Sequence, residues 1–404
     1  MEKIVLKICI FPWQSESRDK RELSACRELG LTPLVMAKGE EHDWYREDEV
    51  SGFRVLRFTT RPLGTRIPAP VNWVATMLCW AHCARKLKPA VISGHDIVAL
   101  TIGWMSTIGT PKAKKPKLVY DSHEFELGRN EKRSKLHLFC LKHLERFLMK
   151  RCAFSIMVND AIADEVQKIH KLKERPIVVR STPNRWTVDP EVCREVRKEL
   201  LNAMEDPREM LLMYHGGVMR GRGVEMLLQE VQRNPAVCAV ILGNGEQGYL
   251  NALKAQADRL GVACRVLFHP AVPLEELWKY AGAADVGMIL APAIVANHLY
   301  SLPNKFFENI QSETPVICPC YPAMKPIADR YGIGLTCDPT SLEDIDRCVE
   351  IMRTDKVFYA QCKENLKKAK EDLCWEKEKA ILQESYRRAI HDNDIKQRLP
   401  DCRQ

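Results

Sequence analysis

Apolar and polar positions follow one another along the chain as short apolar runs separated by longer amphipathic segments. Val5–Phe11 and Leu34–Ala37 have the length and composition of buried strands. Between them, Arg18–Leu29 has the periodicity of a charged amphipathic helix that ends at Gly30. Strands that alternate with helices in this way favour a parallel sheet covered on both faces. The pattern therefore predicts an α/β fold.

The same alternation continues through the first half of the chain. Further strands are expected at Phe53–Phe58, Ala90–Ser93, Leu118–Tyr120 and Ala153–Val158, and helices at 71–87, 97–108, 133–150 and 161–170. Ser181–Pro190 is polar and contains two prolines, which is typical of a linker. After it the pattern begins again, with strands expected at Met210–His215, Val237–Leu242, Val266–Phe268, Val286–Leu290 and Val316–Cys318.

The chain is therefore expected to form two successive α/β domains, as its 404 residues also suggest. We place the first domain at 1–183 and the second at 184–372. Leu373–Ile390 reads as one amphipathic helix, so 373–392 is expected to be helical and 393–404 to be a tail.

Residues 301–318 combine a helix start with charged side chains. Ser301 is expected to cap a helix with Pro303 in its first turn, and a strand follows at Pro315. The free N–H groups of a helix start favour a phosphate, and Lys305 lies in the same turn. Glu308, one turn later, could accept hydrogen bonds from sugar hydroxyls. An ordinary capped helix is the alternative interpretation.

Polar or glycine-rich segments follow several of the predicted strands. They are Gly94-His95-Asp96, Asp121-Ser-His123-Glu124, Gly216–Gly223 and Gly243-Asn-Gly245. In open α/β sheets ligands bind at the carboxyl ends of the strands, and glycines there allow backbone N–H groups to approach phosphate. His123 could contact a ligand or cap the following helix, and Asp96 could cap the helix that starts at residue 97. The sequence contains neither G-x-G-x-x-G after the first strand nor a P-loop motif.

Composition narrows the class of protein. With 46% hydrophobic and 28% charged residues the chain is globular. Its 16 cysteines form no CxxC pair and no zinc-binding spacing, which suits thiols in a reducing cytosol. Met1–Phe11 reads as a first strand and not as a signal peptide. We expect a cytoplasmic protein without a bound metal.

Positive charge is concentrated in residues 51–120. This segment contains a single acid, Asp96, against 11 basic residues: Arg54, Arg57, Arg61, Arg66, Arg85, Lys86, Lys88, Lys112, Lys114, Lys115 and Lys117. Such an excess points to an anionic partner, although solvated surface charge is the alternative. The adjacent apolar stretch Val71–Ala84, with Trp73 and Trp80, is too short to span a bilayer. It could lie on a membrane surface, or both tryptophans could belong to the core.

The ordered set of motifs in the second half resembles the family-4 glycosyltransferases of the GT-B fold. The residues that carry the resemblance are Tyr214-His-Gly-Gly217, Arg222-Gly223-Val-Glu225, Leu242-Gly-Asn-Gly245, Val266-Leu-Phe268 and Ser301-Leu-Pro-Asn-Lys-Phe-Phe-Glu308. The first half matches through Gly94-His95-Asp96 and Val119–Glu124, and Trp375 with the last helix matches the C-terminal helix that returns to the N-terminal domain. The resemblance implies two Rossmann-like domains facing each other across a cleft.

The resemblance also implies a function: a retaining, metal-independent transferase that moves a sugar from a nucleoside-diphosphate sugar to a glycan or lipid-linked glycan, in cell-surface polysaccharide synthesis. The C-terminal domain would hold the donor and the N-terminal domain the acceptor. By that match His123, Arg222 and Lys305 would be catalytic. The donor would contact Gly216, Gly217, Gly243, Gly245, Leu302, Pro303, Asn304 and Glu308. No separate cofactor and no nucleic acid is expected.

One position departs from the family pattern. Many relatives carry a second glutamate eight residues before the position of Glu308, where this chain has Tyr300. The departure leaves the identity of the donor sugar open. Two alternatives also stay open: a nucleotide-sugar epimerase of the same fold, and a non-catalytic subunit that binds a nucleotide sugar. Turnover with release of nucleoside diphosphate separates the transferase from both.

Overall fold

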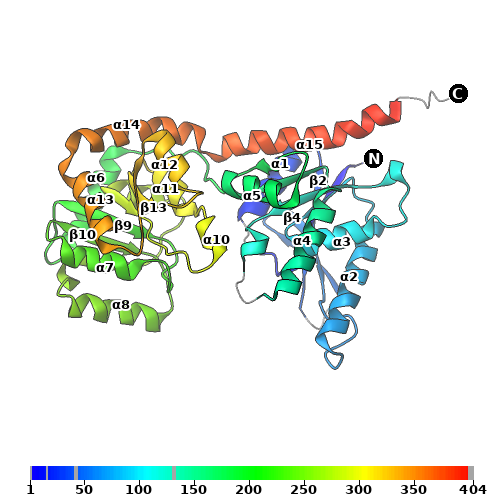
Figure 1. Ribbon diagram of the computed structural model, residues 1–404, viewed down its shortest axis with the longest axis horizontal. Coiled ribbons are helices and arrows are strands. Elements are labelled where there is room, and N and C mark those ends of the chain that lie inside the picture. The colour runs from blue at the N-terminus through cyan, green and yellow to red at the C-terminus, as the bar shows by residue number, and fades with distance from the viewer. Residues whose placement is uncertain (1, 15–16, 41–43, 130–132, 399–404) are drawn as a thin grey trace. The chain divides into compact units, whose positions relative to one another are not determined.

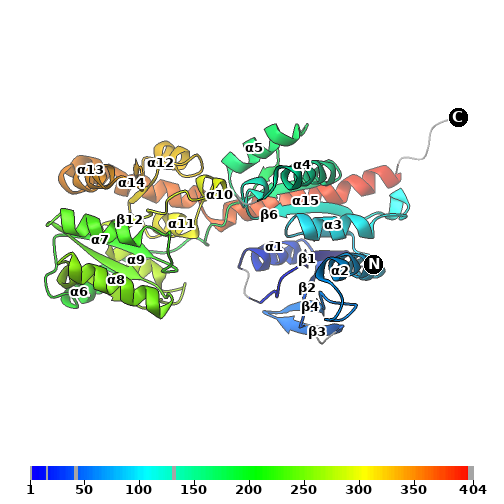
Figure 2. The ribbon, with the colours of Figure 1, turned by 60° about the horizontal axis from the view of Figure 1, so that its bottom comes forward.

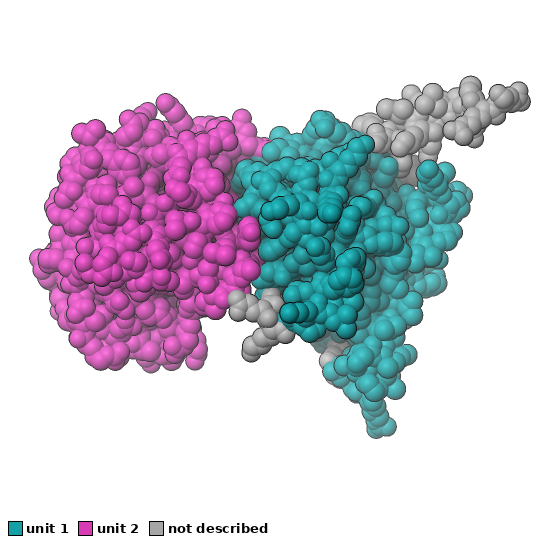
Figure 3. Space-filling view, in the orientation of Figure 1, with its two compact units in different colours: residues 1–180, 378–404 teal, residues 181–377 magenta. Residues whose placement is uncertain are grey.

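A computed structural model describes residues 2–14, 17–40, 44–129 and 133–398. The chain divides into two compact units, residues 1–180 with 378–404, and residues 181–377 (Figures 1 and 3). Each unit is built on a sheet of mainly parallel strands with helices packed against it, so the predicted α/β fold is confirmed. The division falls at residues 180 and 377, close to the expected positions 183 and 372.

Eight strands form the sheet of unit 1 in the order β3-β4-β2-β1-β5-β6-β7-β8. They are β1 (Ile4–Cys9), β2 (Thr32–Lys38), β3 (Tyr45–Val50), β4 (Phe53–Phe58), β5 (Val91–Gly94), β6 (Lys117–Ser122), β7 (Phe154–Met157) and β8 (Ile177–Val178). Figure 2 shows β1, β2, β4 and β3 following one another toward one edge. All the pairs are parallel except β3 with β4.

The main helices of unit 1 are α1 (Ser17–Glu28), α2 (Ala69–Lys86), α3 (Ile97–Ser106), α4 (Lys135–Met149), α5 (Asp160–His170) and most of α15 (Trp375–Arg398), and two short 3-10 turns are η1 (Lys112–Lys114) and η2 (Glu126–Gly128). α2 packs on α3, and α3 on α4. In the sheet, β2 lies on one side of β1, toward β3, whereas β6 lies on the other side of β5, toward β8. Because connections between parallel strands are right-handed, the helices of these two connections, α1 and α3, cover opposite faces of the sheet.

Helix α15 begins in unit 2 and continues into unit 1, where it lies along α1. Lys379 pairs with Glu28 at 3.0 Å, and the Gln383 amide donates to the Ala25 carbonyl at 3.1 Å. The C-terminal helix thus returns to the N-terminal unit, as the resemblance implied. It extends to Arg398, six residues beyond the expected end of the helix at 392, and residues 399–404 lie outside the described part of the chain.

Six parallel strands form the sheet of unit 2 in the order β11-β10-β9-β12-β13-β14. They are β9 (Met210–His215), β10 (Val237–Leu242), β11 (Val266–His269), β12 (Val286–Met288), β13 (Val316–Pro319) and β14 (Gly334–Cys337). Every residue of β9 and β10 is buried, as expected for central strands covered on both faces.

The helices of unit 2 are α6 (Pro190–Asn202), α7 (Val224–Arg233), α8 (Gln247–Arg259), α9 (Leu277–Ala283), α10 (Ala296–Leu299), α11 (Asn304–Gln311), α12 (Lys325–Tyr331), α13 (Leu342–Thr354) and α14 (Lys356–Asp372), with a 3-10 turn η3 (Ala263–Arg265). Phe306, Phe307 and Ile310 of α11 are fully buried against β13. This packing fixes the start of α11 beside the carboxyl ends of the strands.

Among the described residues, no helix is both long enough and apolar enough to cross a bilayer.

Candidate functional site

Two glycine loops interlock at the carboxyl edge of the unit 2 sheet. The Gly216 N–H donates to the Leu242 carbonyl and the Val218 N–H to the Asn244 carbonyl, both at 2.9 Å. Gly216 has a φ of +107°, which favours glycine. A Cβ on Gly243 would lie 1.9 Å from the Gly216 carbonyl oxygen. Gly243 therefore permits the close contact that shapes the loop after β9, and Gly245 does the same against Val218, where a Cβ would lie 2.3 Å from the carbonyl oxygen.

Helix α11 starts at this edge without a side-chain cap. Pro303 holds the N-cap position and Asn304 is the first helical residue, so the expectation that Ser301 caps the helix is wrong. Proline offers no side-chain acceptor for the first-turn N–H groups. An anionic ligand would satisfy those groups, as anions do at other helix starts.

Lys305, in the first turn of α11, points toward the glycine loop. Its Nζ lies 3.6 Å from the centre of the Tyr214 ring and 3.6 Å from where a Cβ on Gly216 would stand. Burial and the neighbouring Arg222 lower the pKa of Lys305 to about 7, although Glu308 acts in the opposite direction. The site therefore holds an amine whose protonated form a bound anion would favour.

Glu308 forms a hydrogen bond with the last residue of β9. His215 Nε2 lies 3.0 Å from Glu308 Oε2, and the exposed fraction is 1% for the histidine side chain and 14% for the glutamate. His215 Nδ1 is buried without a hydrogen-bond partner in the described chain, so the ring hydrogen belongs on Nε2. Glu308 thus anchors α11 to β9 and keeps part of its carboxylate open.

A pocket of about 240 Å³ lies next to Lys305. Arg222, Pro303 and Lys305 line it, together with Ile294, His298 and Tyr321. Arg222 is exposed, and the described residues give it no ion pair. Two cations on one pocket, beside a helix start, can hold a diphosphate.

The structure places the remaining predicted residues of unit 2 around this pocket, outside its lining. Gly217 accepts a hydrogen bond from the Tyr214 hydroxyl at 2.6 Å. Leu302 packs against the core under α11, and Asn304 is exposed on the first turn. The sequence analysis did not single out His215 or the ring of Tyr214 for a role. The sequence did contain a signal for His215, because a polar residue at the end of an otherwise apolar strand, directly before Gly216, is unusual.

His123 lies in unit 1, at the end of β6, in a buried network of charges. Its Nε2 is 2.8 Å from Asp121 and 3.5 Å from Asp19. It therefore does not act mainly as a helix cap, whereas Asp96 does, accepting from the Ala99 N–H at 2.9 Å. Burial lowers the pKa of His123 to about 4, against the effect of Asp121.

Lys7 is the centre of this network. Its fully buried ammonium contacts Asp19 at 3.1 Å, Glu22 at 2.5 Å and Asp121 at 2.7 Å. Burial opposes the ionisation of Asp19, but Lys7 and the neighbouring His95 hold its pKa far below the usual range. Sequence reasoning missed Lys7 and Asp19, because a lysine inside an apolar strand carries no local signal of its partners.

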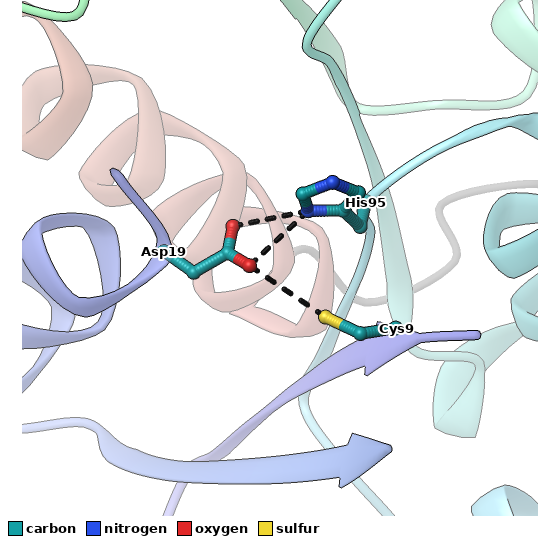
Figure 4. A group of neighbouring side chains, drawn as sticks. All are labelled: Cys9, Asp19 and His95. Atoms are coloured by element: carbon teal, nitrogen blue, oxygen red, sulfur yellow. Dashed lines mark hydrogen bonds and ion pairs between the residues drawn. The ribbon is translucent and has the colours of Figure 1, made fainter. Parts of the chain in front are cut away.

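Asp19 also contacts Cys9 and His95 (Figure 4). Cys9 Sγ lies 3.7 Å from the carboxylate and His95 Nδ1 lies 3.1 Å from it. Such side chains can ligate a metal ion. The Lys7 ammonium already supplies a positive charge to the same carboxylate, so we assign no metal to the group.

No protein-family model and no curated protein matches the chain. Solved structures do match it. Sucrose-phosphate synthase from Thermosynechococcus elongatus is 14% identical with a TM-score of 0.72, over 97% of this chain and 100% of that one. Anabaena HepE in complex with UDP is 14% identical with a TM-score of 0.73, over the same fractions. WaaG, a glycosyltransferase involved in lipopolysaccharide biosynthesis, is 18% identical with a TM-score of 0.59, over 94% and 99%.

These similarities extend over nearly the whole of both chains in each comparison. They show that this chain has the GT-B fold of those glycosyltransferases.

Proposed function

We propose that this chain is a retaining glycosyltransferase of family 4 that takes a sugar from a nucleoside-diphosphate sugar and passes it to a glycan or lipid-linked glycan. Unit 2 binds the donor and unit 1 the acceptor. The observation that carries the proposal is the placement of Lys305 and Arg222 on one pocket beside the glycine loop after β9. The UDP complex of the structurally similar HepE supports a nucleotide ligand for this fold.

Charge development in the reaction explains why two cations are needed. As the bond from the sugar to the diphosphate breaks, the leaving nucleoside diphosphate gains negative charge. Fixed positive groups stabilise that charge more in the transition state than in the ground state. Lys305 and Arg222 supply these groups without a metal ion, and Glu308 accepts hydrogen bonds from the ribose hydroxyls. Gly217 and the start of α11 approach the diphosphate through backbone N–H groups, and Gly216, whose own N–H is bonded to the Leu242 carbonyl, lets the loop lie close to it.

A turnover assay tests the proposal. The purified chain is incubated with UDP-glucose, UDP-galactose, GDP-mannose and ADP-glucose, with and without a bacterial lipid-linked glycan extract. We expect one donor to release nucleoside diphosphate faster when the extract is present, and NMR of the product to show the donor's anomeric configuration. Interconversion of sugars without release would establish the epimerase, and tight binding without turnover the non-catalytic subunit.

A second proposal concerns attachment to an anionic membrane through α2. Val71, Trp73, Val74 and Leu78 are each at least 51% exposed, whereas Trp80 is 1% exposed and donates to the Thr59 carbonyl. The two tryptophans therefore differ, and only Trp80 belongs to the core. Val71, Val74 and Leu78 share one exposed apolar face of α2, and Trp73 is exposed on the opposite side near the start of the helix. Exposed apolar side chains with cations at both ends of the helix suit the surface of an anionic bilayer. Peripheral attachment would bring a lipid-linked acceptor to unit 1.

Not every cation of residues 51–120 is available for such a surface. Arg57 is buried and pairs with Asp48, and Arg85 donates to the Ser106 and Ile108 carbonyls at the end of α3. Arg66 and Lys86, which flank α2, are exposed. Vesicle binding should therefore depend on these two and on the apolar face.

Flotation with phosphatidylglycerol and phosphatidylcholine vesicles tests the attachment. We expect binding to the anionic vesicles alone, weakened by salt, by Trp73→Ala with Leu78→Ala, and by Arg66→Glu with Lys86→Glu. Val357→Ala, at an 83% exposed position of α14, is the matched control and should bind as the wild type does. A wild-type chain that stays unbound at low salt would rule out the attachment.

A further inference from the structure

A cavity of about 550 Å³ lies at the amino edge of the unit 1 sheet. The connections from α4 to β7 and from α5 to β8 form it, and it reaches Phe154 and Ile177, the first residues of those strands. It is more than twice as large as the pocket beside Lys305 and has no lining residue in common with it. We refer to it as the amino-edge cavity.

Much of the lining of the amino-edge cavity is apolar. Met149 is 5% exposed, and Phe154, Leu172 and Ile177 are half-buried. The Phe154 ring packs edge-on against the ring of the fully buried Tyr386, with the ring centres 5.3 Å apart. This contact holds Phe154 in place, so the apolar surface is formed before a ligand arrives. Such a surface suits the organic part of a ligand.

Positive charge surrounds the apolar lining. Four basic residues and one acid line the cavity: Lys150, Lys171, Lys173 and Arg175, against Glu174. Arg175 is already paired with two carboxylates, Asp160 at 2.9 Å and Asp164 at 2.6 Å. The three lysines are exposed and form no ion pair with a described residue. Their ammonium groups are therefore available to an anion.

Lys171 has a backbone conformation that usually selects glycine. It ends α5 with a φ of +48° and a ψ of +54°. A side chain costs stability in this left-handed conformation, and glycine is the commonest residue at such a position after a helix. A strained residue of this kind points to a use for its side chain. Here the side chain adds a third ammonium group to the cavity.

Three free ammonium groups beside an apolar surface favour an organic phosphate. A phosphate monoester carries roughly two negative charges at neutral pH, with three acceptor oxygens. Inorganic phosphate alone would fill little of the cavity, whose volume lies within the range of roughly 300–1,000 Å³ that is usual for sites of small organic ligands. A neutral molecule would leave the ammonium groups without a partner.

We propose that the amino-edge cavity binds a phosphate monoester, with the phosphate among Lys150, Lys171 and Lys173 and the organic part against Met149 and Phe154. The inference goes beyond the proposed transfer reaction and does not depend on it, because the cavity contains no residue of the donor site. A soluble sugar phosphate and the headgroup of phosphatidic acid share this chemistry, and experiment separates them.

Protection of lysines from acetylation tests the site directly. The chain is treated with a low dose of acetic anhydride, alone or with glucose 6-phosphate, dihexanoyl phosphatidic acid, glucose or inorganic phosphate, and mass spectrometry quantifies each lysine. We expect a phosphate monoester to lower the labelling of Lys150, Lys171 and Lys173 severalfold and to leave Lys88 unchanged. The ester that protects at the lower concentration identifies the source, a free sugar phosphate or a lipid headgroup. Equal protection by glucose or by inorganic phosphate, or none by either ester, would overturn the proposal.

Lys171→Gly and Lys88→Gly form a matched pair of variants. Lys88 has a φ of +47° after α2, is exposed, and lies outside the cavity. Both substitutions relieve a left-handed conformation, so neither should lower the melting temperature. Only Lys171→Gly should weaken binding of the protecting ester, by about 3- to 10-fold. Lys150→Gln with Lys173→Gln should weaken it further. Wild-type affinity in all these variants would overturn the proposal.

UDP binding separates this site from the donor site. None of the three lysines lines the pocket beside Lys305, so their variants should bind UDP with the wild-type affinity. Lys305→Met should conversely keep the affinity for the ester. If Lys305→Met loses the ester and Lys171→Gly keeps it, the ester binds at the donor site and the amino-edge cavity is not a phosphate site.

Discussion

The Lys305 ammonium lies 3.6 Å from the centre of the Tyr214 ring. An aromatic face attracts a cation without neutralising it. None of the described carboxylates comes within ion-pair distance of Lys305. No ion pair with a described residue therefore neutralises Lys305. Its charge is available to a ligand beside the glycine loop that a diphosphate would approach.

The pH dependence of nucleotide binding should report this arrangement. With its pKa near 7, the free Lys305 is mostly neutral at pH 8.5, and a bound diphosphate favours the charged form. Binding of UDP should therefore take up a proton above pH 7, and affinity should fall by up to about tenfold per pH unit. Calorimetry in two buffers of different ionisation enthalpy measures the uptake. Lys305→Arg stays charged and should remove it; equal uptake in this variant would assign the proton elsewhere.

Glu308→Ala should weaken donor binding without unfolding the chain. The substitution removes the acceptor for ribose hydroxyls and leaves His215 Nε2 without its partner. We expect a several-fold rise in the donor KM, and a loss of about 1–3 kcal/mol of stability from the unpaired buried imidazole. Glu308→Gln should recover stability but not affinity. A wild-type donor KM in Glu308→Ala would remove this residue from the site.

Arg222→Ala should lower turnover more than donor affinity, because its partner gains charge as the glycosidic bond breaks. Removal of one such electrostatic donor costs roughly 10²–10³ in kcat. Arg259→Ala is the matched control, since Arg259 is exposed at the end of α8 and does not line the pocket. Steady-state kinetics of both variants decide the point. A loss confined to KM would mean that Arg222 binds ground state and transition state alike.

The sequence predicted the strands of unit 2 where apolar residues run without interruption. Met210–His215 and Val237–Leu242 are observed with the expected bounds, as β9 and β10. Strand β3 was not expected, because its sequence YREDEV is charged and lies at the exposed edge of the sheet. Ser181–Pro190 is irregular as expected, but its last proline opens α6, which the sequence analysis did not include.

The site residues that could be predicted from the sequence are those that belong to short local motifs. Gly216, Arg222 and Lys305 stand in short motifs after a strand or at a helix start. The His215–Glu308 pair joins residues 93 positions apart, and the contact of Lys7 with Asp121 joins residues 114 apart. Such pairs depend on which strands and helices become neighbours, and no periodicity in the chain specifies that.

The burial of Glu230 in unit 2 predicts a separate effect of pH on the free energy of unfolding. Its carboxylate is buried without a hydrogen-bond partner in the described chain, and burial with the nearby Asp346 raises its pKa from 4.5 to about 8. The folded state therefore binds more protons than the unfolded state between these pH values, and stability falls as pH rises from about 4.5 to 8.

Glu230→Gln should remove this dependence. The variant is expected to gain on the order of a few kcal/mol over the wild type at pH 8.5 and little at pH 5, since one pKa unit corresponds to about 1.4 kcal/mol. Urea unfolding at the two pH values measures the difference, with Glu364→Gln on the exposed face of α14 as control. Equal differences at both pH values would mean that Glu230 is ionised in the folded state.

Calorimetric titration of UDP into the wild-type chain and into Lys305→Met tests the central claim most directly. The account predicts binding to the wild type at neutral pH, stoichiometric with the chain, and a loss of at least about tenfold in affinity for Lys305→Met at an unchanged melting temperature. Saturation at 100 times the dissociation constant should also stabilise the wild type by about 2.7 kcal/mol. If UDP and the other nucleoside diphosphates fail to bind the folded wild type, or bind Lys305→Met equally well, the pocket beside Lys305 is not the donor site.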